Sequence, residues 1–230
     1  MFFDPMYLLF VSPALLLGLW AQFRVQSTYA ATREMPAPLS GAAAARYVLD
    51  SAGLRSVAIE EIPGQLTDHY DSRAKVLRLS TDVFQTRSVA AVGIAAHEAG
   101  HALQDAFGYA PLVLRNAAVP LAGLGSNLGI LLVIVGAVLQ ATLHWSPFVI
   151  WLGIGLFSSV VVFQVVNLPV EFNASSRAKQ QLAALGIVDQ EQLYYVEKML
   201  NAAALTYVAA TLQAVMVLLY LLMRFGNRRD

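Results

Sequence analysis

The chain has 230 residues, of which 57% are hydrophobic and only 13% are charged. A soluble domain carries about 25% charged residues, so the deficit indicates contact with lipid. The 15 basic and 15 acidic side chains cancel, which argues against a nucleic-acid partner, and the absence of cysteine excludes disulfides and thiolate metal sites.

Four apolar segments are long enough to cross a bilayer, which takes about 20 mostly apolar residues. None of them contains Lys, Arg, Asp or Glu. The predicted transmembrane helices cover residues 6–23, 117–142, 148–166 and 205–223. A cleaved signal peptide is the alternative for the first segment. No Lys or Arg precedes that segment, which favours its retention as an anchor.

The charged residues gather in two polar regions, 24–116 and 167–204. The first region reads as a small α+β domain, in which Ser40 caps a helix that Gly53 ends. Its other predicted elements are strands over 57–62 and 75–80, a turn over 70–73 and a helix over 86–107 that Gly108 ends. The second region is expected to be helical. The predicted fold is therefore a mainly α membrane protein with a short β-sheet or hairpin.

Four spans place both polar regions on one side of the membrane. The basic residues near the span ends on that side are Arg24, Arg33, Arg115, Arg177, Lys179 and Lys198. Arg224, Arg228 and Arg229 lie on the opposite side and act against this asymmetry. The positive-inside rule then favours a cytoplasmic location for the polar regions.

Chemistry is indicated by the sequence His97-Glu98-Ala99-Gly100-His101. On a helix, residues four apart project from the same face, so both imidazoles can reach one metal ion. Glu98 is then placed to take a proton from a metal-bound water, as in zinc proteases with this spacing. A pair of core histidines is the structural alternative, but the apolar, small-residue surroundings favour a metal site.

A catalytic zinc ion has three protein ligands and one open position, so a third ligand must come from elsewhere. His69 and His144 are candidates, although His144 is predicted on the wrong side of the membrane. Glu171 is favoured, because it directly follows the third span on the side of His97. Pro169 is expected to mark a break or a first helical turn before it. An ion pair of Glu171 with Arg177 or Lys179 is the alternative.

The sequence resembles the YugP-like neutral zinc metallopeptidases of bacterial membranes and, more distantly, HtpX-like and CAAX-prenyl endopeptidases, all of which are gluzincins. The matching stretches are residues 66–71, 75–80, 95–105, 168–172 and 201–210. The resemblance implies a zincin-like catalytic domain in the bacterial inner membrane. It also implies one zinc ion bound by His97, His101 and Glu171, with Glu98 as general base. HtpX-like enzymes carry an aspartate four residues after the ligand glutamate, where this chain has Ser175.

Further roles are predicted for residues around the motif. Asp105 lies one turn beyond His101 and is expected to support that histidine, with a solvated acid as the alternative. Tyr207 and His69 are candidate donors to the oxyanion, against the alternatives of a membrane-interface tyrosine and a surface histidine. The strand Lys75, Val76, Leu77, Arg78 and Leu79 is a candidate for aligning an extended substrate, against the alternative of an interior strand.

The predicted function is therefore a membrane-embedded zinc endopeptidase that cleaves membrane-associated or other polypeptides. A zinc-binding membrane chaperone or scaffold with weak catalysis is the alternative. A metal transporter is disfavoured because the spans contain no ionisable acid or base. Small residues at Gly125 and Gly129, and at Gly153 and Gly155, predict close helix packing, within the bundle or between chains of an oligomer.

Overall fold

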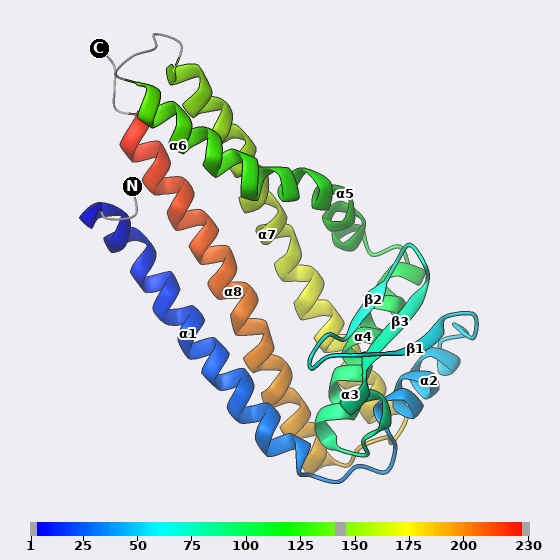
Figure 1. The fold of residues 1–230 in the computed structure, drawn as a ribbon. Coiled ribbons are helices and arrows are strands. Elements are labelled where there is room, and N and C mark those ends of the chain that lie inside the picture. The colour runs from blue at the N-terminus through cyan, green and yellow to red at the C-terminus, as the bar shows by residue number, and fades with distance from the viewer. Residues whose placement is uncertain (1–3, 141–145, 227–230) are drawn as a thin grey trace. The chain divides into compact units, whose positions relative to one another are not determined.

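The computed structural model describes residues 4–140 and 146–226. Most of the described chain is helical, as the sequence predicts (Figure 1). In chain order the elements are α1 (Pro5–Arg33), α2 (Gly41–Ser51), β1 (Ala58–Ile62), β2 (His69–Asp71), β3 (Val76–Ser80), α3 (Thr81–Gln85), α4 (Val89–Ala106), α5 (Ala110–Leu124), the π-helix η1 (Gly125–Gly129), α6 (Ile130–Leu139), α7 (Ser146–Ala184) and α8 (Gln190–Gly226).

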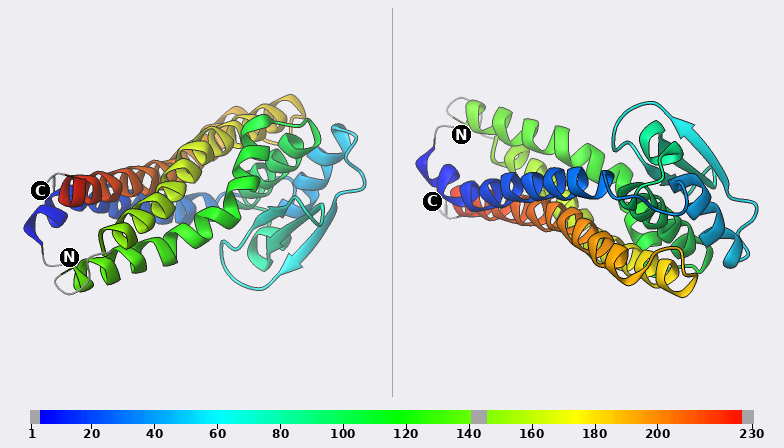
Figure 2. Two further views of the ribbon diagram at one scale, coloured as in Figure 1. Left: turned by 90° about the horizontal axis from the view of Figure 1, so that it is seen from above. Right: turned by 90° about the horizontal axis from the view of Figure 1, so that it is seen from below.

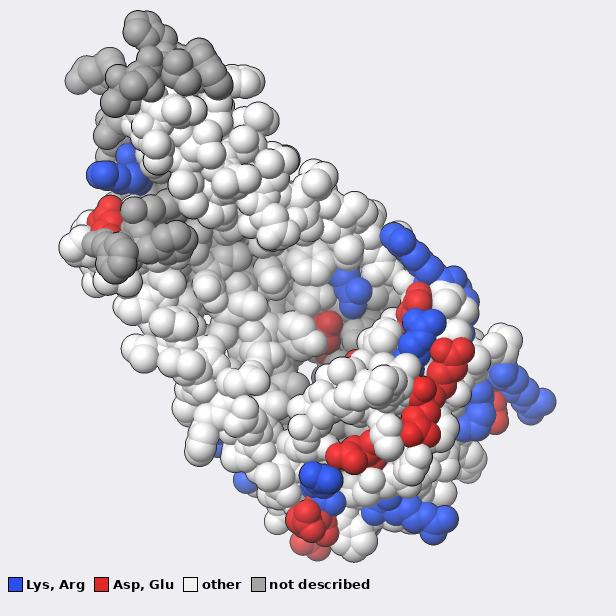
Figure 3. Space-filling model, in the orientation of Figure 1, with Lys and Arg blue, Asp and Glu red and all other residues white. Residues whose placement is uncertain are grey.

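The chain divides into two compact units. The helical unit comprises Met1–Trp20, Leu114–Leu168 and Thr206–Asp230, and the sheet unit comprises Ala21–Val113 and Pro169–Leu205. Helices α1, α5, α7 and α8 contribute residues to both. On the face drawn in Figure 3, acidic and basic side chains gather over the sheet unit.

Four helices are long and apolar enough to cross a membrane: Pro5–Arg33, Ala110–Leu139, Ser146–Ala184 and Gln190–Gly226. The prediction of a mainly α membrane protein with about four transmembrane helices and a small α+β region is confirmed. The first, third and fourth of these helices extend beyond their uncharged segments at both ends, whereas the second begins before its segment and ends at Leu139, and residues 141 and 142 of that segment lie outside the described residues. The helix that contains the second segment is formed by α5, η1 and α6 in succession.

The helical unit is held together by close packing of η1 and α6 against α7, which runs beside them (Figures 1 and 2). A Cβ on Gly153 would lie 2.6 Å from the carbonyl oxygen of Gly129, and one on Gly125 would lie 2.3 Å from the carbonyl oxygen of Leu156. Three of the four predicted packing glycines therefore work within the bundle. No described atom outside the local backbone lies within 4 Å of such a Cβ on Gly155.

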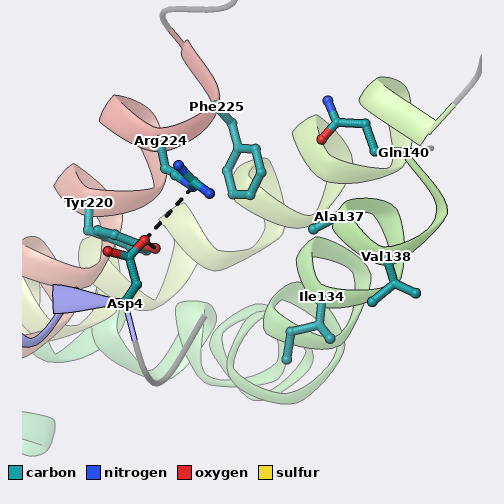
Figure 4. Close-up of a pocket in the computed structure, with 8 residues that line it drawn as sticks. All are labelled: Asp4, Ile134, Ala137, Val138, Gln140, Tyr220, Arg224 and Phe225. Atoms are coloured by element: carbon teal, nitrogen blue, oxygen red, sulfur yellow. Dashed lines mark hydrogen bonds and ion pairs between the residues drawn. The ribbon is translucent and has the colours of Figure 1, made fainter. Parts of the chain in front are cut away.

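One end of the helical unit contains a pocket of about 330 Å³ (Figure 4). Asp4 caps the start of α1 by accepting a hydrogen bond from the backbone of Met6. The same carboxylate accepts a hydrogen bond of 2.9 Å from Tyr220 and lies 3.9 Å from Arg224. These contacts connect the beginning of α1 with the end of α8.

The sheet unit contains a three-stranded sheet with the order β1-β3-β2. Strand β1 pairs with β3 in parallel and β2 pairs with β3 antiparallel, so β3 is the central strand. Helices α2 and α4 pack together, with Val48, Leu49 and Val92 fully buried. The predicted helix at Ser40 is confirmed, since the Ser40 side chain accepts the N–H of Ala43.

Two predicted boundaries in the sheet unit are wrong. The turn predicted over 70–73 begins later, because His69–Asp71 forms β2. The Asp71 carboxylate accepts the N–H groups of Arg73 and Ala74, which shifts the turn past the strand. The helix predicted from residue 86 begins at Val89, because Ser88 is its N-cap and accepts the N–H of Ala91.

The predicted break at Pro169 is also wrong. Helix α7 continues through Pro169 to Ala184, so Glu171 lies on the same helix as the third apolar segment. Proline removes only one backbone N–H, and helices of membrane proteins tolerate this where neighbouring groups compensate.

Candidate metal centre

Small residues on α4 let two helices of the sheet unit come close enough to share a metal site. Ala95, Ala96 and Ala99 are fully buried along α4. A Cβ on Gly100 would lie 2.6 Å from the carbonyl oxygen of Ala174 on α7. The glycine within the motif therefore permits an approach that brings Glu171 opposite the two histidines.

His97, His101 and Glu171 come together as one group that can hold a metal ion. Oε2 of Glu171 lies 3.3 Å from Nε2 of His97 and 3.5 Å from Nε2 of His101. Ligand atoms at about 2.0–2.2 Å from a tetrahedral zinc ion are separated by roughly 3.3 Å. Both spacings from Glu171 therefore fit two ligands of one zinc ion, and all three ligand atoms lie within 4.8 Å of one another.

The second nitrogen of each histidine has its own partner. Oε1 of Gln104 lies 2.9 Å from Nδ1 of His101, and Oγ of Ser175 lies 3.1 Å from Nδ1 of His97. Nε2 of Gln104 donates to the Val170 carbonyl at 2.7 Å, which orients its amide so that Oε1 is the atom facing His101. Because a carbonyl oxygen only accepts, Nδ1 of His101 carries the proton and Nε2 keeps a lone pair for the metal.

The prediction that Asp105 supports His101 is wrong. Asp105 accepts a hydrogen bond of 2.7 Å from the hydroxyl of Tyr70 and pairs with Lys75. The place beside His101 is taken by Gln104, three residues along the helix instead of four. Burial and the bond to Asp105 raise the pKa of the Tyr70 phenol, which keeps it protonated.

The centre has a negative electrostatic character. Burial lowers the pKa of His101, but the bond to Glu171 and the charges of Glu98 and Glu171 outweigh that effect and raise it. Glu98 lies on α4 directly after His97 and is half-buried. The site therefore favours a positive charge between the imidazoles and the carboxylate, and a metal ion would supply that charge.

Asp68 is a further acid near the centre, for which the sequence analysis proposed no role. Its side chain accepts the N–H and the hydroxyl of Ser80. Burial is the main cause that raises its pKa, and the charge of Glu98 adds to this against the bonds from Ser80. The only sequence signal was its position within the stretch 66–71 of the family resemblance.

Among the described residues, the other sequence-predicted candidates are not part of the metal-binding group. His69 is exposed on β2, with Nδ1 2.9 Å from the carbonyl of Thr67, and it is not in the metal-binding group. Arg177 donates to Asn173, and Lys179 pairs with Glu197, so both alternative partners of Glu171 have acceptors of their own. Tyr207 belongs to the helical unit, and His144 lies outside the described residues.

The substrate-aligning role predicted for the strand 75–79 does not agree with the sheet order. Leu77 is paired with Ile59 on one side and with Tyr70 on the other. An added strand needs an unpaired edge, and in this sheet the edges are β1 and β2. Leu77 and Leu79 are fully buried, so this strand is the interior strand that was the alternative reading.

Comparisons with known proteins agree with this geometry. A family model described as "Putative neutral zinc metallopeptidase" matches residues 7–226. The chain is 45% identical over 219 residues to a protein of Bacillus subtilis (strain 168) named "Putative membrane protease YugP", covering 94% of this chain and 95% of that protein. No solved structure gives a significant match. The family resemblance is confirmed.

Proposed function

Since this chain belongs to the neutral zinc metallopeptidase family, we propose that it is a membrane endopeptidase that uses one zinc ion to hydrolyse peptide bonds. The observation that carries the proposal is the donor set of His97, His101 and Glu171, which two different helices bring together. The proposed substrates are membrane-associated or other polypeptides.

Glu98 is the proposed general base. A bound zinc ion polarises a peptide carbonyl and lowers the pKa of a water molecule in the open position. The Glu98 carboxylate takes the proton from the attacking water and delivers it to the departing amine nitrogen, so the peptide bond breaks without a free amide anion. Its place beside His97 on α4 supports this role.

Gln104 and Ser175 are the proposed positioning residues. Each binds Nδ1 of one ligand histidine and thereby directs Nε2 toward Glu171. Both partners are neutral, whereas ligand histidines often face a carboxylate. The negative charge among these residues then comes from Glu98 and Glu171 and not from the partners of the histidines.

The donor that stabilises the oxyanion is proposed to be Tyr207 or His69. Both carry a polar group suited to that role, and neither takes part in the metal-binding group. The tyrosine next to His69, Tyr70, is not proposed for this role, because its hydroxyl already donates to Asp105.

We further propose that the protein lies in the bacterial inner membrane with the sheet unit facing the cytoplasm. The four apolar helices and the name of the Bacillus relative support a membrane location. The excess of basic residues at the span ends beside the polar regions supports the orientation.

The test is metal analysis of the full chain purified in detergent, together with turnover of a library of quenched-fluorescence peptides. We expect close to one zinc ion per chain in the wild type and in a Glu98→Gln variant. The variant should lose turnover by roughly 10²- to 10⁴-fold, the usual contribution of a general base.

Each other outcome has a defined meaning. A wild type without stoichiometric zinc contradicts the proposal, and a fully active Glu98→Gln variant contradicts the role of Glu98. Zinc binding without turnover of any peptide would favour the alternative, a zinc-binding membrane chaperone or scaffold.

A further inference from the structure

A second polar pocket, of about 240 Å³, lies in the sheet unit between α1 and α8. Six polar residues line it: Arg24, Ser27, Thr28, Thr32, Tyr195 and Lys198. None of them belongs to the metal-binding group or contacts it through a hydrogen bond described above. The pocket is therefore a separate feature of the molecule.

Helical periodicity explains how this pocket forms. Arg24, Thr28 and Thr32 are four residues apart and share one face of α1, while Tyr195 and Lys198 share one face of α8. The hydroxyls of Thr28 and Thr32 donate to backbone carbonyls one turn earlier in the helix. These short side chains stay close to α1 and leave space between the two helices.

The charge of the pocket is positive. Arg24 and Lys198 line it, and no carboxylate does so among the described residues. The nearest acid along α8, Glu197, pairs with Lys179 at 2.9 Å, so its charge is already balanced. Two cationic side chains therefore line this pocket, with no carboxylate among its described lining residues, and this arrangement suits an anion.

The position along the chain indicates which anion. Arg24 directly follows the uncharged run 5–23, and Lys198 directly precedes the uncharged run 199–223. Where an apolar helix crosses a bilayer, the first charged residues beyond its apolar run lie at the level of the lipid headgroups. Basic pockets between membrane helices at this level bind anionic headgroups.

We propose that the pocket between α1 and α8 binds a phosphate group, held by Arg24 and Lys198. The same chemistry is offered by an anionic phospholipid and by free phosphate, and the level of the two cations favours the phospholipid. This binding is independent of the peptidase reaction proposed above.

The test measures the rise in the thermal unfolding midpoint of the full chain in detergent as ligand is added. The three ligands are phosphatidylglycerol, phosphatidylcholine and inorganic phosphate. We expect the wild type to bind phosphatidylglycerol more tightly than phosphatidylcholine. Each of Arg24→Gln and Lys198→Gln should weaken phosphatidylglycerol binding by about fivefold, since one cation near a membrane surface contributes about that factor.

A matched control is the double variant Arg55→Gln, Arg73→Gln, which removes two exposed cations from the same unit. It should bind phosphatidylglycerol like the wild type, whereas Arg24→Gln, Lys198→Gln should bind about 25-fold more weakly. The zinc content per chain checks that each variant is folded. If the double variant is not folded, Lys198→Gln alone gives the test, because Lys198 is exposed.

A different result would identify free phosphate as the ligand of the same site. In that case the protein binds inorganic phosphate, both pocket substitutions weaken this binding, and the protein shows no preference between the two lipids. The proposal is overturned if the pocket variants and the control variant bind all three ligands with the same affinity as the wild type. Because the zinc content is measured separately, either result leaves the proposed peptidase function unaffected.

Discussion

The amide oxygen of Gln104 lies 2.9 Å from Nδ1 of His101. The nitrogen of the same amide donates to the carbonyl of Val170, the residue before Glu171. One fully buried glutamine therefore contacts one metal ligand directly and the backbone beside another. It links α4 to the turn of α7 that supplies the carboxylate.

We expect Gln104→Leu to weaken zinc binding by about 10- to 100-fold, the usual cost of losing the partner of a ligand histidine. The substitution removes the acceptor for His101 and the donor to Val170 together. Competition with a chromophoric chelator measures the affinity. The matched control is Asp105→Asn, which should keep the affinity of the wild type because Asp105 contacts Tyr70 and Lys75. Equal losses in both variants would contradict the assignment of Gln104.

Ser175 stands where the HtpX-like enzymes carry an aspartate, and it lies 3.1 Å from Nδ1 of His97. Ser175→Ala removes this partner, so zinc affinity should fall by about tenfold. Ser175→Asp supplies a carboxylate in the same place and should restore or exceed the affinity of the wild type. The chelator assay compares all three proteins. An alanine variant with unchanged affinity would show that the serine hydroxyl does not support His97.

Gly100→Ala should destabilise the protein and weaken zinc binding. The added methyl group would lie 2.6 Å from the Ala174 carbonyl oxygen, so α4 and α7 must separate. Overpacking of this kind costs about 1–3 kcal/mol of unfolding free energy. Thermal unfolding in detergent measures the loss. Gly123→Ala is the control, because no described atom outside the local backbone lies within 4 Å of a Cβ there. The prediction fails if both variants unfold at the same temperature.

Glu171 and His69 were rival candidates for the third ligand, and the two substitutions should separate them. Glu171→Ala removes a donor that lies 3.3 Å from Nε2 of His97, so zinc affinity should fall by more than roughly 100-fold, beyond the loss for an outer partner. His69→Ala should leave zinc binding unchanged, since His69 lies outside the metal-binding group. Metal analysis after dialysis against a weak chelator measures both. Retained zinc in Glu171→Ala would point back to His69.

The absence of cysteine makes the membrane orientation directly testable. A single reporter in the Arg73→Cys variant marks the sheet unit, and one in the His144→Cys variant marks the loop between the second and third spans. We expect a membrane-impermeant maleimide to label residue 144 in intact spheroplasts and to leave residue 73 unlabelled until lysis. The reverse pattern would place the sheet unit outside the cell, and labelling of both residues would contradict four spans.

The sequence by itself determined the features that depend on short segments of chain. The apolar segments and the helix with His97 and His101 follow from composition and from the 3.6-residue period, which neighbouring residues set among themselves. Local capping was predicted correctly at Ser40 but missed at Ser88, because Thr86 and Ser88 offer similar side chains only two positions apart.

Only the tertiary structure decided which distant segments meet. His101 is bound by Gln104 and not by Asp105, because Gln104 also reaches Val170 on α7 while Asp105 is drawn to Tyr70 and Lys75. The strand 75–79 is interior because both β1 and β2 pair with it. These two strands are separate segments of the chain, joined by a loop. The motif His97-Glu98-Ala99-Gly100-His101 predicted a metal site, but the close approach of Ala174 to Gly100 brings Glu171 next to the two histidines. Contacts between residues so far apart in the chain, such as Gly100 and Ala174, depend on tertiary packing that no local pattern encodes.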